Sequence, residues 1–275
     1  MQSKLKIGFI GGGNMAVALI TGLLQAGTHA KDIHVVDVNQ ANLNRLETEF
    51  NVTTSLQIDA HLQQMDVIVL AVKPQQLRDV VGALAPHLRH QLLISIAAGI
   101  RATDISRWLS SYPRIVRVMP NTPALIGRGV TGLFALPEVT EAEKQCADDI
   151  LRAVGSTSWV VEEKLIDVVT AVSGSGPAYV FYFIEAMQQA AQELGLSPEQ
   201  GTQFAIATFE GAAQLAMRSD EDVAVLRERV TSKGGTTYAA LSSMEESDVK
   251  NHIITAIKAA ASRATALGEE FGQQA

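Results

Sequence analysis

Through about residue 163, short apolar segments alternate with stretches whose apolar residues recur at helical spacing. Several of the short segments are apolar at nearly every position, which is typical of parallel strands buried on both faces. Strands and helices that alternate in this way predict a doubly wound α/β sheet. The candidate strands are residues 6–10, 33–38, 66–72, 92–97, 114–120, a weaker 131–137, and 157–163.

In the remainder of the chain the strand pattern stops, and apolar residues recur only at helical spacing. One predicted helix begins with Ser197, Pro198 and Gln200, which supply an N-cap, a first-turn proline and a capping-box partner. We therefore predict two domains, residues 1–163 with the α/β sheet and residues 164–275 built only from helices. The apolar stripes of so small a helical domain favour burial against a second copy of the chain, as a homodimer.

The segment "VTSKGGTTYAAL", residues 230–241, interrupts the helical half. Glycine is about 1 kcal/mol less favourable than alanine inside a helix, and threonine is also a poor helix former. The glycines and threonines at 234–237 therefore predict a break between helices, a helix cap, or a place where the main chain closely approaches another molecule.

A glycine-rich turn, "GFIGGGNMAVAL", directly follows the first candidate strand and opens a helix. Gly11, Gly13 and Ala16 have the spacing G-x-G-x-x-G/A. The first glycine of this pattern allows a tight turn, the second lets a pyrophosphate approach the main chain, and the third small residue lets the helix pack on the strand. The helix N-terminus adds amide donors for phosphate. In this position the pattern predicts a dinucleotide site.

Asp37 ends the second candidate strand, where an acidic side chain can accept hydrogen bonds from the ribose hydroxyls of a dinucleotide. A carboxylate here would repel the 2′-phosphate of NADPH, and the nearest arginine, Arg45, lies within the following helix. The residue therefore favours NADH and leaves NADPH open. A second interpretation is that Asp37 only caps the helix that starts near Ala41.

Three further segments, residues 71–74, 95–99 and 118–123, lie at predicted strand ends, where ligands of open α/β sheets bind. Each combines small residues or proline with a turn, and any one of them can be an ordinary loop between a strand and a helix. Together with the glycine pattern on the same edge of the sheet, they predict a nicotinamide pocket.

Charge and composition narrow the choice of partners. The net charge of −7, with scattered lysines and arginines, argues against nucleic acid and anionic membranes, which need basic patches. The segment "MQSKLKIGFIGGG" lacks the pattern of a signal peptide. Cys146, the one cysteine, is interpreted as a buried or half-buried thiol in a capped helix, and no clustered metal ligands occur. We expect a cytoplasmic protein without a metal.

Six motifs, "GFIGGGNMA", "AVKP", "SIAAG", "MPNTP", "SGSGPAYVFYFIEA" and "VTSKGGTT", occur in the order and spacing of the pyrroline-5-carboxylate reductases. The chain resembles this family from about Lys6 to the last predicted helix. The resemblance implies a Rossmann domain followed by an all-helical dimerisation domain, with rings of dimers in some members. It also implies the last step of proline biosynthesis, the reduction of the cyclic imine Δ1-pyrroline-5-carboxylate to L-proline by NADPH or NADH.

The resemblance also implies site residues, and two positions depart from the family pattern. Lys233 stands where many members have proline, and Asp37 where many have serine or another small residue. Ser173, implied as a substrate contact, has a second interpretation as a helix cap. The implied substrate contacts are Ser173, Gly234, Gly235, Thr236 and Thr237. Together with Asp37, which is expected from its place at a strand end, the implied cofactor contacts are Ile10, Gly11, Gly13, Asn14, Met15, Ala71, Val72, Lys73, Pro74, Ala97, Ala98, Gly99 and Asn121.

The implied chemistry asks little of side chains. A protonated imine accepts hydride at its carbon without a strong general acid, so catalysis would depend mainly on holding nicotinamide C4 close to that carbon. The Thr237 hydroxyl would be the one catalytic group and would reach the ring nitrogen. Amides of residues 234–237 could hold the substrate carboxylate at the start of a helix.

Two rival functions remain open at this point: an NAD(H)-sensing dimer without catalysis, and a 3-hydroxyacid dehydrogenase of the phosphogluconate type. The first would not need the Gly-Gly-Thr-Thr loop. The second would need a lysine in the helix after "SGSGPAY", where none occurs.

Overall fold

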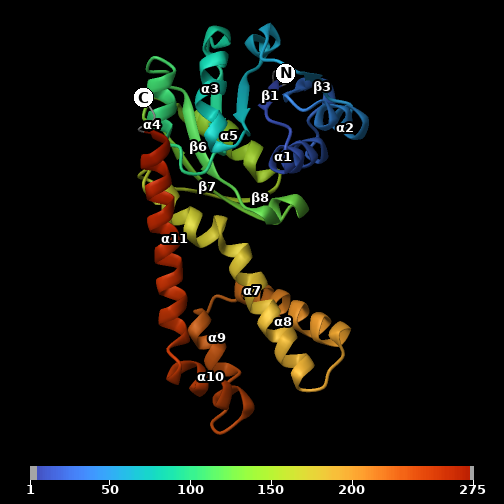
Figure 1. Ribbon diagram of the computed structural model, residues 1–275, viewed down its shortest axis with the longest axis vertical. Coiled ribbons are helices and arrows are strands. Elements are labelled where there is room, and N and C mark those ends of the chain that lie inside the picture. Colours follow the sequence, from blue (N-terminus) through green and yellow to red (C-terminus); the bar gives the residue numbers. More distant parts are fainter. Residues whose placement is uncertain (1–4, 273–275) are drawn as a thin grey trace. The chain divides into compact units, whose positions relative to one another are not determined.

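The computed structural model describes residues 5–272 and divides into two compact units (Figure 1). The first unit runs to Ser175 and includes the chain from Ala260 onward, and the second comprises Gly176–Ala259. Each unit is described by itself below. The first four residues of the amino-terminal segment, which was examined for a signal peptide, lie outside the described residues.

An eight-stranded sheet forms the centre of the first unit, with strand order β3-β2-β1-β4-β5-β6-β7-β8. All neighbouring strands are parallel except β6 and β7, which pair antiparallel. The central strands β1, β2, β4 and β5 are buried at every position, so both faces of the sheet are covered. The strands are β1 Ile7–Ile10, β2 Ile33–Val36, β3 Thr53–Ser55, β4 Val67–Leu70, β5 Leu92–Ser95, β6 Ile115–Met119, β7 Gly129–Ala135 and β8 Gly155–Trp159.

The sequence predicted the doubly wound sheet correctly but missed β3 and misplaced the end of β8. Strand β3 is only three residues long, is polar and lies at the edge of the sheet, so it carries no apolar signal. The predicted strand at 157–163 is wrong beyond Trp159, because the chain turns there and Val161 is 87% exposed. A strand at 131–137 was predicted, but the sequence did not predict that β7 runs antiparallel to β6.

Helices and short turns connect the strands of the first unit. Helix α5, expected from the sequence as a capped helix, begins with a capping box of Thr140 and Glu143. It carries Cys146, whose pKa is raised to about 11, mainly by burial, so the thiol is not a reactive one. The helices are α1 Asn14–Gln25, α2 Gln40–Phe50, α3 Pro74–Leu84, α4 Ala102–Trp108, α5 Glu141–Arg152 and α6 Leu165–Val169. The turns are η1 Ala30–Asp32, η2 Ala60–Gln64, η3 Ala85–His87, η4 Thr122–Ile126 and the π-helical η5 Thr170–Gly174.

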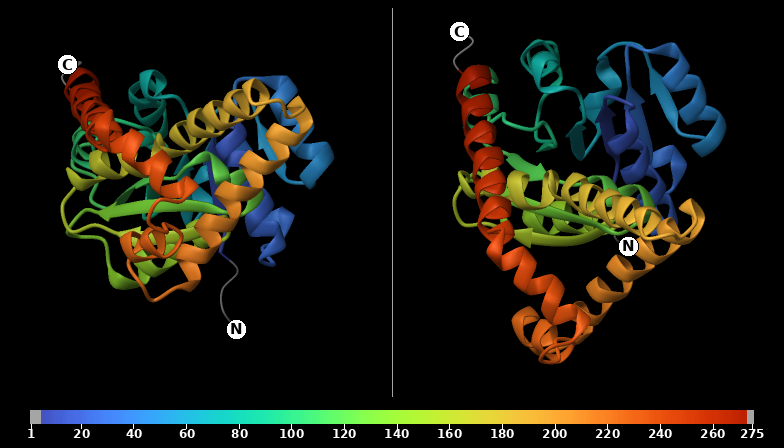
Figure 2. Two further views of the ribbon diagram at one scale, coloured as in Figure 1. Left: turned by 90° about the horizontal axis from the view of Figure 1, so that it is seen from below. Right: turned by 60° about the horizontal axis from the view of Figure 1, so that its bottom comes forward.

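The second unit consists of helices. Two of them, α7 and α8, pack against each other as a hairpin (Figure 2). Helix α8 starts with the predicted capping box of Ser197 and Gln200. The predicted break in residues 230–241 is also confirmed, because α9 ends at Arg229 and the next helix starts only at Thr236. The helices are α7 Gly176–Glu193, α8 Pro198–Arg218, α9 Val223–Arg229, α10 Thr236–Glu246 and α11 Val249–Gly272, whose last part belongs to the first unit.

Residues 176–259 bury very little of their own apolar surface. Within this described segment only Gly201 and Ala205 are buried, and Ala191 lies against Gly201 in the α7–α8 hairpin. Large side chains such as Tyr182 (73% exposed) and Met217 (78% exposed) lie open. Between residues 5 and 272, none of the helices combines the length and the apolar character that crossing a membrane requires.

The compact units do not coincide with the domain division at residues 163 and 164, which stays a prediction. Helix α6 and the π-turn η5 pack on the sheet, where Val169 lies against Gly132 of β7 and Asp167 pairs with Arg117 of β6. The sheet-containing unit therefore extends to Ser175.

Candidate functional site

A pocket of about 750 Å³ lies at the carboxyl ends of β1, β2, β3 and β4. Strands β1 and β4 are the neighbours between which the strand order reverses, and this switch point is where open α/β sheets bind ligands. The pocket is lined by Ile10, Gly11, Gly13, Val36, Asp37, Val38, Asn39, Asn42, Leu56, Gln57, Ile58, Ala71, Val72, Lys73, Gln76, Asp79, Val80 and Ala83.

The glycine turn between β1 and α1 has the geometry of a phosphate cradle. Gly11 has a φ of +101°, and a β-carbon there would lie 2.4 Å from the carbonyl oxygen of Ala71. Gly13 is the N-cap of α1, and around its β-carbon position nothing lies within 4 Å. No side chain among the described residues caps α1, so its first amides remain available to an anion. The residues present fit a dinucleotide's pyrophosphate.

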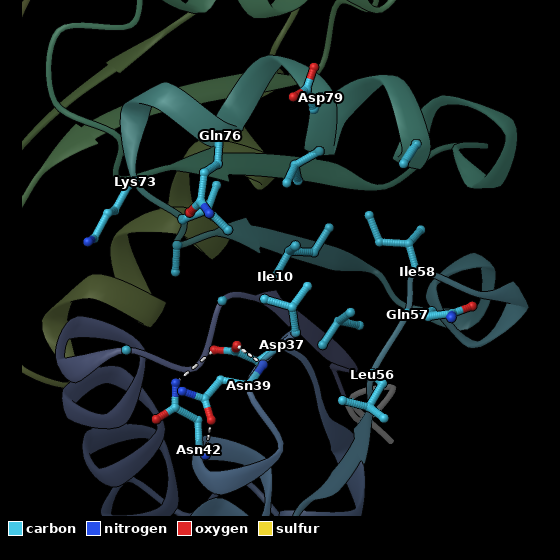
Figure 3. A pocket seen from close by; sticks show the side chains of 18 residues that line it. Ile10, Asp37, Asn39, Asn42, Leu56, Gln57, Ile58, Lys73, Gln76 and Asp79 are labelled. Carbon is cyan, nitrogen blue, oxygen red and sulfur yellow. Dashed lines mark hydrogen bonds between the residues drawn. The ribbon is translucent and has the colours of Figure 1, made fainter.

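Asp37 lies in this pocket at the end of β2, near Asn39 and Asn42 (Figure 3), and is held in place by three donors. Its Oδ2 accepts from the Gly12 amide at 2.7 Å and from Asn42 Nδ2 at 3.2 Å, and its Oδ1 accepts from the Asn39 amide at 2.8 Å. The interpretation of Asp37 as the cap of α2 is wrong, because the Asn39 side chain accepts from the Ala41 amide and is the N-cap. Asp37 instead joins the end of β2 to the glycine turn.

The structure brings part of the predicted cofactor set into the pocket and leaves the rest outside its lining. Asn14 and Met15 form the first turn of α1, and Pro74 is the first residue of α3. Residues 97–99 follow β5 further along the same edge. The predicted residues that line the pocket are Ile10, Gly11, Gly13, Asp37, Ala71, Val72 and Lys73.

Sequence reasoning missed several residues that line the pocket. Leu56, Gln57 and Ile58 follow β3, and they were missed because that strand was missed. Asn39 and Asn42 carry a readable signal, since asparagine at the start of a helix is a common cap. Lys73 and Gln76, at the start of α3, lie across the pocket from Asp37 and Asn42 (Figure 3).

Asn121 does not line the pocket and instead ties three segments of the first unit together. Its Nδ2 donates to the carbonyl oxygen of Ser173 at 3.2 Å, and its Oδ1 accepts from the Val130 amide at 2.9 Å. Both ends of the buried amide are therefore used within the protein. Its position between β6 and η4 fixes where the π-turn η5 lies.

Ser173 lies in η5, and its hydroxyl is not a helix cap. The oxygen is buried and has no hydrogen-bond partner among the described residues. A buried hydroxyl without a partner is costly, and π-turns are frequent at functional sites. The structure therefore disfavours the interpretation of Ser173 as a cap of α7 and leaves its hydroxyl without a partner among the described residues.

The segment Gly234–Thr237 lies in the second unit at the start of α10. Gly235 is the N-cap, and no side chain among the described residues accepts from the first amides of the helix. The Gly235 amide donates to the carbonyl oxygen of Ser232 at 3.0 Å, which closes the turn that precedes the helix. Thr236 is exposed and Thr237 is half-buried. The start of α10 can therefore bind an anion by its amides.

The pocket lining contains neither histidine nor cysteine, and residues 5–272 contain no cluster of three or more histidine, cysteine, aspartate or glutamate side chains that could hold a metal.

A dinucleotide cradle at the switch point of a doubly wound sheet, followed by a helical unit, defines an oxidoreductase that uses a nicotinamide dinucleotide.

Comparison with known proteins identifies the family. Residues 163–267 match the family model described as pyrroline-5-carboxylate reductase dimerisation, and residues 6–99 match the model described as NADP oxidoreductase, coenzyme F420-dependent. A pyrroline-5-carboxylate reductase of Pseudomonas aeruginosa is 42% identical over 273 residues, which cover 99% of this chain and 100% of the relative.

Solved structures agree with this match. A pyrroline-5-carboxylate reductase from Coxiella burnetii is similar with a TM-score of 0.90 and 40% identity, over 96% of this chain and 99% of that one. A Plasmodium falciparum pyrroline carboxylate reductase with NADP bound has a TM-score of 0.86 and 31% identity, over 96% of this chain and 98% of that one. The chain belongs to the pyrroline-5-carboxylate reductase family. It is an oxidoreductase that reduces pyrroline-5-carboxylate to proline, which removes the two rival functions.

Two glycine variants separate cofactor binding from folding. Gly13→Ala should weaken binding of reduced nicotinamide dinucleotide roughly 10-fold or more, because its new methyl group would occupy the open space that the pyrophosphate needs. Its Tm should stay close to that of the wild type, since a φ of −73° suits alanine. Gly11→Ala should lower the Tm by several degrees because of its strained φ and the clash with Ala71.

Fluorescence titration of the reduced cofactor and thermal melts measure both effects. Wild-type affinity in Gly13→Ala would contradict the placement of the pyrophosphate.

Proposed function

We propose that this enzyme holds the carboxylate of pyrroline-5-carboxylate on the amides of Gly234–Thr237, and that Ser173 is a second substrate contact. The proposal is supported by the start of α10, which has no side-chain cap among the described residues. A carboxylate at a helix start gains amide hydrogen bonds and the positive end of the helix dipole. The orphaned hydroxyl of Ser173 adds a buried donor that is otherwise unused.

The reaction needs orientation more than acid–base chemistry. A reduced nicotinamide, when bound, would supply a hydride to the imine carbon; the C=N double bond would become a single bond, and the protonated imine nitrogen would become the ring amine of proline. The Thr237 hydroxyl orients the ring nitrogen, directly or through a water molecule, and contributes modestly to the rate. The main contribution is to hold the two reactants close together.

Thr237→Ala should lower kcat/KM for the imine by about 10-fold and leave the KM of the cofactor unchanged, because the hydroxyl contacts only the substrate. Thr237→Ser should retain most of the activity. Thr231→Ala is the matched control, because that hydroxyl, in the same turn, donates to the Arg227 carbonyl at 2.6 Å. The decay of nicotinamide absorbance measures all three, and an unchanged kcat/KM in Thr237→Ala would refute the role.

We propose further that the remaining cofactor residues act as the family resemblance implies and that NADH is the preferred cofactor. The preference is supported by Asp37, whose carboxylate lies in the pocket where the ribose would bind. No arginine lines the pocket, and its one lysine, Lys73, lies across the pocket from Asp37 (Figure 3). A 2′-phosphate would therefore meet a carboxylate without a compensating cation.

Asp37→Ser should lower the ratio of kcat/KM with NADH to kcat/KM with NADPH by about 10-fold or more, because it removes the repulsion of the 2′-phosphate. Asp79→Ser, at another acidic residue of the pocket lining, should leave the ratio unchanged. Steady-state kinetics with both cofactors measure the ratio. A wild-type enzyme that already prefers NADPH would contradict the assignment.

We also propose that the enzyme is a cytoplasmic homodimer, or a ring of dimers, whose helical domain comprises residues 164–275. The match of residues 163–267 to a dimerisation model and the exposed apolar side chains of residues 176–259 support a dimer. The acidic net charge and the single cysteine agree with a cytoplasmic enzyme.

Light scattering in solution should give twice the chain mass of 29.4 kDa, or an even multiple of it, because the apolar helices need a covering surface. A fully active particle with the mass of a single chain would contradict the dimer.

A further inference from the structure

The π-turn that carries Ser173 is fastened to β6 and to the residue that follows it. Arg117 and Met119 are two apart in β6, so their side chains share one face of the sheet, and Asn121 comes two residues after the strand ends. Each of the three contacts the segment from Glu163 to Gly174. This arrangement makes β6 the element that sets the position of Ser173.

Arg117 makes the first of these contacts and is 2% exposed. Its Nη2 lies 2.8 Å from Asp167 Oδ1, and its Nη1 lies 3.5 Å from Glu163 Oε1. The same carboxylates bind further elements, since Glu163 accepts from the Ala102 amide at 2.5 Å and Asp167 accepts from the Thr265 hydroxyl at 3.3 Å. The guanidinium therefore holds α6 against β6 through a largely buried ion pair with Asp167.

The second and third contacts fix the far end of the turn. Gly174 lies against Met119, since a β-carbon on Gly174 would come within 2.5 Å of Met119 Cε. Asn121 Nδ2 donates to the Ser173 carbonyl. Between the two anchored ends, the Ser175 amide donates to the Thr170 carbonyl at 2.8 Å, which is the five-residue bond of a π-turn. The Ser173 hydroxyl in this turn is buried and has no hydrogen-bond partner among the described residues.

We propose that Arg117 is a positioning residue for imine reduction, which acts by holding Asp167 and thereby setting the π-turn that presents the Ser173 hydroxyl to the substrate. The inference rests on the proposed role of Ser173 as a substrate contact. The sequence contains a signal for it, because Arg117 is the only charged residue in the strand "IVRVM". A buried charge in such a strand is costly unless a specific arrangement requires it.

A double-mutant cycle between Arg117 and Ser173 tests the proposal in the full-length enzyme. Arg117→Lys keeps the charge but loses the two-pronged geometry, and it should lower kcat/KM for pyrroline-5-carboxylate by up to about 10-fold. Ser173→Ala should lower it about 10-fold. The kcat/KM of the double variant should be no lower than that of the less active single variant, because both changes remove the same contact. The dissociation constant of the reduced cofactor should change less than about 2-fold in each variant.

Two further variants control for folding. Arg114→Lys changes an arginine that precedes the same strand and binds Glu143 and the His90 carbonyl, each at 2.5 Å, and it should leave kcat/KM for the imine unchanged. Asp167→Asn keeps the shape of the carboxyl partner and takes the place of Arg117→Lys in the cycle if the lysine variant does not fold.

The outcomes separate the two proposals. Normal activity in Ser173→Ala would remove the role of Ser173 and the inference with it. An impaired Ser173→Ala beside a normal Arg117→Lys would overturn the inference alone, as would losses that multiply in the double variant. A loss of cofactor affinity in Arg117→Lys equal to its loss of kcat/KM would also overturn it, since it would indicate a general structural role.

Discussion

Main-chain amides at the open starts of two helices are the interaction on which the account of this enzyme depends. Helices α1 and α10 begin with glycine N-caps in the same extended conformation, with φ of −73° at Gly13 and −82° at Gly235, and neither has a side-chain cap among the described residues. Helices α2, α5, α8 and α9 are capped by their own side chains instead. Glycine leaves room for an anion at the first amides, whereas a capping side chain would fill that place. Helices α3, α4 and α6 also lack a cap from their N-cap side chains, but those residues are Lys73, Arg101 and Lys164. We propose that the two helix starts with glycine N-caps bind the two anionic reactants.

The two helix starts lie in different units and are held in place by different surroundings. The turn at α1 is anchored by a sheet that is buried on both faces, and Asp37 ties that turn to β2. The turn at α10 belongs to helices that bury few side chains of their own. A helical unit that exposes this much apolar surface acquires a defined shape only when the surface is covered. In this account the substrate turn depends on assembly more than the cofactor turn does.

Much of the fold and part of the site could be predicted from the sequence, for physical reasons that differ between residues. Gly11, Gly13 and Asp37 belong to a local pattern whose spacing fixes its geometry, and all three line the pocket. Strand β3 could not be found because its three polar residues lie at an edge. The unpartnered hydroxyl of Ser173 depends on contacts with a strand more than 50 residues away, so no local signal reveals it. Arg117 had a readable signal, a charge in a buried strand, that the family motifs do not include.

The most direct test of the central claim is a crystal structure of the enzyme with NADH and the product L-proline bound together. The account predicts that the proline carboxylate accepts hydrogen bonds from amides within Gly234–Thr237 and that the pyrophosphate lies against the amides at the start of α1. A proline carboxylate paired with a lysine or arginine side chain, while the turn before α10 faces away from it in every subunit, would contradict the account.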